Sequence, residues 1–115
     1  MAIVTVSKDN FDAVVENNDL VVADFWAPWC GPCQSFNTVV ENLEKDFPDV
    51  TFAKINIDEQ AELADEFDVK SVPAIMVIRS QVVVMAQSGT LSASALRDLI
   101  EQAKQLDSAD LQKSK

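Results

Sequence analysis

The chain has 115 residues, of which 48% are hydrophobic, and this is enough for one domain whose core needs no structural metal and no framework of disulfides. It carries 9 basic and 19 acidic residues, so its formal net charge is −10 at pH 7. Because nucleic acids and anionic membranes select basic surfaces, this charge argues against both as partners.

The N-terminal region carries no sign of export. Residues 1–20 alternate short apolar runs with charged side chains, and they lack the basic segment and apolar run of a secretory signal. The longest apolar stretch, residues 72–78, is far shorter than a membrane span and contains a proline. We therefore expect a soluble, cytoplasmic protein.

The chain begins with a strand and a short helix. Residues 3–6 are apolar or β-branched and predict the strand. Serine is a favoured N-cap residue, so we expect Ser7 to start the helix that follows. The apolar side chains at helical spacing are Phe11, Val14 and Val15.

A central strand and a longer helix come next. Residues 20–26 are apolar almost throughout, which is typical of a strand covered on both faces. After the cysteines, apolar positions at helical spacing predict a helix that Pro48 closes. These positions are Phe36, Val39, Val40, Leu43 and Phe47.

The second half of the chain repeats this alternation and then changes it. Residues 50–57 predict a strand, and a short helix follows at Leu63, Ala64 and Phe67. Residues 74–79 and 82–87 are strand patterns separated by two residues, so they predict a hairpin of antiparallel strands. The last helix has its apolar residues at Ala95, Leu96, Leu99, Ile100 and Ala103.

This order of elements predicts an α/β fold in which helices flank a mixed central β-sheet. We expect residues 1–106 to form a single domain. Residues 107–115 are polar and predict a weakly ordered C-terminal tail.

The only two cysteines, Cys30 and Cys33, lie three positions apart. A bridge across so short a loop gains little loop-closure entropy, so structural stapling explains it poorly. At a helix start, free backbone N–H groups and the dipole would stabilise the thiolate of Cys30, and Pro32 fits the first turn. Cys33, one turn further on, should be more buried and should remain a thiol. Zinc would need four ligands, and the chain has no histidine and no second cysteine pair.

Four segments resemble the thioredoxin family, and they occur in the order that the family has. Residues 23–33, Ala-Asp-Phe-Trp-Ala-Pro-Trp-Cys-Gly-Pro-Cys, are similar to its active-site stretch, and residues 53–58 are similar to its third strand. Residues 71–74, Ser-Val-Pro-Ala, are similar to the loop with the family's cis-proline, and residues 88–90 match the glycine after the last strand. The resemblance implies the thioredoxin fold, with helices on both faces of the mixed sheet.

The resemblance also implies catalytic roles. Cys30 would be the nucleophile and Cys33 the resolving thiol. Asp24 would be the buried acid that exchanges a proton with Cys33, and its place inside an apolar strand agrees, because ionisation is costly there. Lys54 would be the partner of Asp24 on the neighbouring strand, although a lysine that reaches solvent from a strand edge explains this residue equally well.

A substrate-binding surface is implied in the same way. Pro73 would lie against the disulfide, and the backbone of Val72 would hydrogen-bond an extended substrate chain. The full set is Trp29, Gly31, Pro32, Val72, Pro73 and Gly89.

The sequence departs from the family pattern at several positions. Thr38 occupies the place of a helix-kinking proline, which predicts a straighter helix, and Gln34 replaces a basic residue after the second cysteine. Ala74 stands where a threonine is usual, and the turn at residues 79–81 has no glycine.

Together the residues and the resemblance predict a thiol–disulfide oxidoreductase that reduces protein disulfides. By resemblance it would be a monomer without a bound cofactor, and NADPH would supply its electrons through a thioredoxin reductase. Two alternatives stay open. One is a redox relay for a single partner, which the acidic surface favours, and the other is a thioredoxin-fold binding module whose cysteines are incidental.

Overall fold

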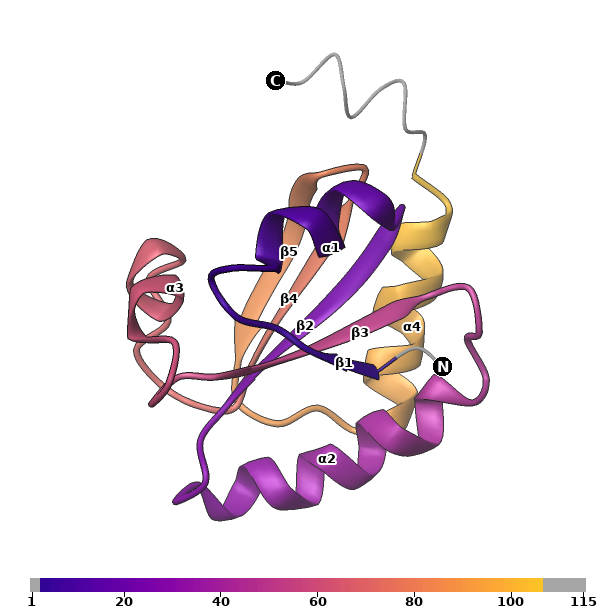
Figure 1. The fold of residues 1–115 in the computed structure, drawn as a ribbon. Coiled ribbons are helices and arrows are strands. Elements are labelled where there is room, and N and C mark those ends of the chain that lie inside the picture. Colours follow the sequence, from indigo (N-terminus) through magenta and orange to yellow (C-terminus); the bar gives the residue numbers. More distant parts are fainter. Residues whose placement is uncertain (1–2, 107–115) are drawn as a thin grey trace.

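The computed structural model describes residues 3–106, so the predicted tail at residues 107–115 lies outside the described residues (Figure 1). The strands are β1 Ile3–Thr5, β2 Leu20–Trp26, β3 Thr51–Asn56, β4 Ala74–Arg79 and β5 Val82–Ser88. The helices are α1 Phe11–Asn17, α2 Gly31–Glu44, α3 Ala61–Glu66 and α4 Ala93–Lys104.

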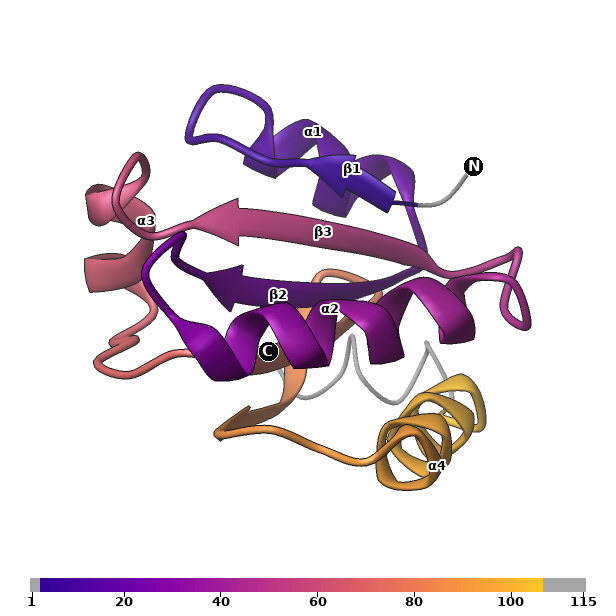
Figure 2. The same ribbon diagram turned by 90° about the horizontal axis from the view of Figure 1, so that it is seen from below.

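The strands form one five-stranded sheet in the order β1-β3-β2-β4-β5. β1, β3 and β2 run parallel, whereas β4 and β5 are antiparallel to their neighbours. Helices α2 and α4 cover one face and α1 and α3 cover the other (Figures 1 and 2). The predicted α/β architecture, a mixed sheet with flanking helices on both faces, is confirmed.

Strand β2 lies in the middle of the sheet and separates two apolar cores. Leu20 and Val22 pack with α2 and α4, whereas Val21, Ala23 and Phe25 pack toward α1 and α3. This alternation follows from the two-residue period of a strand, and it explains why the whole run had to be apolar. It also places Asp24 on the side of β2 that α2 covers.

The expected helix cap at Ser7 is wrong. Helix α1 begins at Phe11 with Asn10 as its N-cap, and a turn separates it from the strand. Ser7 opens that turn: its hydroxyl accepts a hydrogen bond from the N–H of Asp9 at 3.2 Å, and its carbonyl accepts one from Phe11 at 2.9 Å. A serine before a helix can cap a turn as well as a helix, because the hydroxyl bonds an N–H two residues on in either case.

The expected end of the long helix is also corrected. Helix α2 stops at Glu44, so Phe47 is buried but lies outside the helix and Pro48 does not close it. Turn hydrogen bonds from Asp46 to Leu43 and from Phe47 to Glu44 finish the segment instead. Phe47 fits the apolar spacing of the helix although it lies beyond the helix end, because it packs into the core from the turn.

The hairpin between β4 and β5 is confirmed, and its turn is unusual in composition. Ser80 and Gln81 have φ angles of 51° and 69°, the left-handed conformation that suits a two-residue hairpin and favours glycine or asparagine. A residue with a Cβ atom is disfavoured there. This turn therefore costs stability that a glycine would restore.

We predict that Gln81→Gly stabilises the protein by about 0.5–1 kcal/mol, because relief at a positive φ exceeds the added entropy of the unfolded chain. The matched control is Gln87→Gly in the extended β5, which should destabilise the protein by a similar amount. Urea unfolding of both variants measures the sign of each change in the free energy of unfolding. Destabilisation by Gln81→Gly would show that the side chain makes contacts that outweigh the strain.

Candidate active site

The two cysteines lie where the chain leaves β2 and enters α2. The N–H of Cys30 donates to the carbonyl of Ala27 at 3.1 Å, which fixes the turn between strand and helix. Cys30 is the N-cap of α2, and its sulfur accepts a hydrogen bond from the N–H of Cys33 at 3.1 Å. The sulfurs of Cys30 and Cys33 form a disulfide, with the Cα atoms 5.3 Å apart.

The two cysteine residues are almost equally buried, so the greater burial expected for Cys33 does not distinguish them. Cys30 is 4% exposed and Cys33 is 3% exposed. The difference between them lies in hydrogen bonding, since it is the sulfur of Cys30 that receives a backbone N–H at the helix start. Pro32 stands in the first turn of α2, where its missing N–H group breaks no helix bond.

Asp24 is the only buried charged side chain among residues 3–106, with 2% of its surface exposed. Its Oδ1 atom has no hydrogen-bond partner in that part of the chain. It lies opposite Lys54 on β3 and Ile75 on β4. Burial raises the pKa of Asp24 to about 6, and the positive charge of Lys54 opposes part of that rise.

Lys54 is next to Asp24 in the sheet, but its ammonium is bound elsewhere. Its Nζ donates a hydrogen bond to Oδ1 of Asn37 on α2 and lies 4.9 Å from the centre of the Trp26 ring. No ion pair joins Lys54 to Asp24. The structure thus brings the two predicted residues together and adds Asn37, which the sequence analysis missed. Nothing in the local sequence pattern indicates Asn37, because its partner Lys54 lies on a distant strand.

The loop before β4 lies next to the disulfide. The Val72–Pro73 peptide bond is cis, as the resemblance implies. Val72 packs against the small cluster that contains both cysteines, and within residues 3–106 its N–H and C=O have no hydrogen-bond partner. Gly89, at φ 94°, donates its N–H to the carbonyl of Pro73 at 2.8 Å. That bond ties the end of β5 to the same loop.

Trp29 is the most exposed large hydrophobic residue of the described chain, at 68%. Its indole Nε1 donates to both carboxylate oxygens of Asp58, at 3.1 and 3.2 Å. Asp58 follows β3, and the sequence analysis did not single it out. Gly31 and Pro32 are exposed between the two buried cysteines, so they and Trp29 form the surface next to the disulfide.

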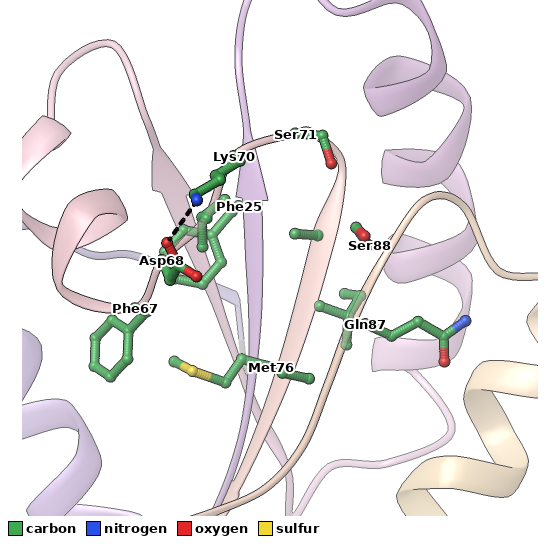
Figure 3. Close-up of a pocket in the computed structure, with 12 residues that line it drawn as sticks. Phe25, Phe67, Asp68, Lys70, Ser71, Met76, Gln87 and Ser88 are labelled. Atoms are coloured by element: carbon green, nitrogen blue, oxygen red, sulfur yellow. Dashed lines mark ion pairs between the residues drawn. The ribbon is translucent and has the colours of Figure 1, made fainter.

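A separate pocket of about 250 Å³ lies between the loop after α3 and the strands β4 and β5 (Figure 3). Its floor is apolar, with Phe25, Phe67 and Met76, and the Asp68–Lys70 ion pair lies at its edge. Neither cysteine lines this pocket. The redox chemistry therefore belongs to the surface at Cys30 and not to this cavity.

Residues 3–106 show neither a candidate metal site nor a membrane-spanning helix. No three histidine, cysteine, aspartate or glutamate side chains of residues 3–106 are grouped so that they could hold a metal ion. In the same range no helix has the length and apolar character needed to cross a membrane.

Comparisons with known proteins show the family to which this chain is similar. The family model described as Thioredoxin matches residues 2–102. "Putative thioredoxin 2" of Streptomyces coelicolor is 44% identical over 111 residues, which cover 96% of this chain and 83% of that protein. The thioredoxin of Bacillus subtilis is 38% identical over 101 residues, which cover 87% of this chain and 96% of that protein.

Solved structures are also similar. A mutant thioredoxin from Halobacterium salinarum matches with a TM-score of 0.86 and 37% identity, covering 92% of this chain and 94% of that one. The oxidized form of mitochondrial thioredoxin 3 from Saccharomyces cerevisiae matches with a TM-score of 0.81 and 29% identity, covering 87% and 94%.

The buried carboxyl predicts a pH-dependent stability. Because the folded pKa of Asp24 is about 6 and the unfolded value is about 3.9, the folded state holds this proton to higher pH than the unfolded state does. The free energy of unfolding should fall as pH rises from about 4, and this loss should level off above about 6. Its size is about 3 kcal/mol at most.

We expect Asp24→Asn to remove this loss and to be more stable than the parent at pH 7. Urea unfolding of the oxidised protein between pH 4 and pH 8 measures the effect, and Glu101→Gln on the exposed side of α4 is the matched control. A parent protein whose stability does not change across this range would contradict the raised pKa.

Proposed function

This chain belongs to the thioredoxin family of thiol–disulfide oxidoreductases and has its fold, and from that premise we propose how its residues share the reduction of a protein disulfide. The observation that carries the proposal is the hydrogen bond from the N–H of Cys33 to the sulfur of Cys30 at the start of α2. In the reduced protein the same N–H and the helix dipole stabilise a thiolate on that sulfur. Cys30 is therefore the nucleophile.

The reaction runs through a mixed disulfide. The thiolate of Cys30 attacks one sulfur of the substrate disulfide, the bond between the substrate sulfurs breaks, and the other sulfur leaves as a thiolate. The thiol of Cys33 then gives up its proton, and its sulfur attacks that of Cys30. The second substrate thiolate is released, and the Cys30–Cys33 disulfide remains.

Asp24 accepts the proton of Cys33 in this scheme. It lies under α2, the helix that carries Cys33, and no hydrogen bond occupies its Oδ1 atom. A base works best when its pKa is near the working pH, and a carboxyl with a pKa of about 6 is close to that condition. Lys54 is the cation that adjusts this pKa, because its charge favours the ionised carboxylate.

The substrate chain binds next to the disulfide. The unpaired N–H and C=O of Val72 are suited to a short β-type pairing with an extended segment, while Pro73 lies beside them. Trp29, Gly31 and Gly89 are exposed around this loop and form the rest of the contact surface. Backbone bonding of this kind is indifferent to the side chains of the partner, and this supports a range of protein substrates.

We also propose the domain organisation, the cellular location and the electron donor of the protein. Residues 1–106 act as one domain with residues 107–115 as a polar tail, and the protein works as a monomer in the cytoplasm. The Cys30–Cys33 disulfide is its redox centre, and NADPH supplies electrons through a thioredoxin reductase. The family membership supports this proposal, because resemblance to the thioredoxins implies an electron donor of this kind.

We predict that Cys33→Ser traps mixed disulfides with substrate proteins, because the variant keeps the nucleophile and lacks the thiol that resolves the intermediate. Cys30→Ser should trap almost none. Non-reducing electrophoresis of each variant with an oxidised substrate protein measures the adducts, and the double variant Cys30→Ser, Cys33→Ser is the control. Faster alkylation of Cys33 than of Cys30 near neutral pH would reverse the assignment.

We also expect a bacterial thioredoxin reductase with NADPH to reduce the parent protein and, through it, the disulfides of insulin. NADPH oxidation followed with and without insulin separates the two steps. Reduction of the protein without turnover on insulin would indicate a relay for one partner. No reduction at all would exclude a thioredoxin reductase of this class as the electron donor.

A further inference from the structure

We propose that Asn37 of α2 is a positioning residue, which holds the ammonium of Lys54 and keeps it from pairing with the buried carboxyl of Asp24. The inference rests on the proposed role of Asp24 as the proton acceptor for Cys33. By holding the ammonium, Asn37 controls how strongly the positive charge of Lys54 acts on the Asp24 carboxyl.

The sheet register makes Asp24 a natural partner for Lys54. The two residues are directly opposite on the parallel strands β2 and β3, so their side chains leave the sheet on the same side. An unpaired buried carboxyl next to a lysine would ordinarily accept its hydrogen bond. In this structure Oδ1 of Asp24 has no partner, and the ammonium donates to Asn37 instead.

The amide of Asn37 is oriented for this task. Its Nδ2 donates to Oε2 of Glu41, one turn further along α2, at 3.2 Å. A carboxylate can only accept and an ammonium can only donate, so a single orientation of the amide satisfies both neighbours. Glu41 thereby directs Oδ1 of Asn37 toward Lys54, and the Trp26 ring, 4.9 Å from Nζ, gives the ammonium a second favourable contact.

The surroundings of Asp24 leave Lys54 as the charge that matters. β3 contributes Lys54, and β4 contributes the uncharged Ile75. α2 and α4 pack into the core on this side of the sheet through apolar residues, and neither cysteine titrates in the disulfide. Within residues 3–106, Lys54 is the only charged group that acts on the Asp24 carboxyl.

The first test measures the titration of Asp24 itself. In Asn37→Ala the ammonium loses its acceptor and pairs with Asp24, so the midpoint of the carboxyl titration should fall by about one pH unit. In Asn37→Asp a charged acceptor binds the ammonium more strongly, so the midpoint should stay at the parent value or rise. Carboxyl NMR chemical shifts of the oxidised protein against pH report both midpoints.

A double-variant cycle separates positioning from any structural effect. In a Lys54→Met background Asn37→Ala should leave the midpoint unchanged, because no ammonium remains to be released. The matched control is Thr38→Ala, the exposed neighbour of Asn37 on α2, which should leave the parent midpoint unchanged. An unchanged midpoint in Asn37→Ala, or the same fall in the Lys54→Met background, would overturn the proposal. So would a rise, since Asn37 would then draw the ammonium toward Asp24.

The pH profile of disulfide exchange keeps this inference distinct from the proposed function. The resolving step, followed in single turnover against pH, should move toward lower pH in Asn37→Ala together with the Asp24 midpoint. A midpoint that moves while the rate profile stays would leave Asn37 as the positioning residue and would reject Asp24 as the proton acceptor.

Discussion

Burial of β2 on both faces of the sheet is the constraint on which the site depends. The strand must be apolar to separate the two cores, and Asp24 is the one charged residue placed inside it. Removing its carboxyl from water accounts for the raised pKa. The buried strand ends at Trp26, and the turn at residues 27–30 then places Cys30 at the start of α2. The proposed acid and the proposed nucleophile therefore owe their places to a single element.

In the proposed mechanism, stabilisation of the Cys30 thiolate must come mainly from the backbone. Gln34 occupies the position after the second cysteine where the family usually has a cation, and Lys54, the one lysine within the described strands, is bound to Asn37. The N–H of Cys33 remains as a direct donor to the sulfur of Cys30. A dipole and one N–H are worth less than a full charge nearby, so these departures bear on how strongly the protein reduces.

The sequence predicted what periodicity and residue chemistry determine. The hairpin, the central strand and the cysteine pair at a helix start follow from local patterns, and the cis Pro73 followed from the family resemblance. The two wrong predictions concern helix ends, where two local structures satisfy the same sequence pattern. Ser7 can cap a turn or a helix, and Phe47 can reach the core from a turn or from a helix. Asn37 and Asp58 were missed because they act through partners on distant segments, Lys54 and Trp29, which spacing along the chain does not reveal.

The partner of Lys54 is neutral, and this sets it apart from five other cations of residues 3–106. Lys8, Lys70, Arg79, Arg97 and Lys104 each pair with a carboxylate. A carboxylate at position 37 would also bind the ammonium, but its negative charge would offset the positive charge of Lys54 that acts on Asp24. An amide fixes the ammonium in place and leaves its charge intact. The acceptor at position 37 thus meets two demands at once: it keeps Lys54 out of contact with the buried acid, and it preserves the field that limits how far the pKa of that acid rises.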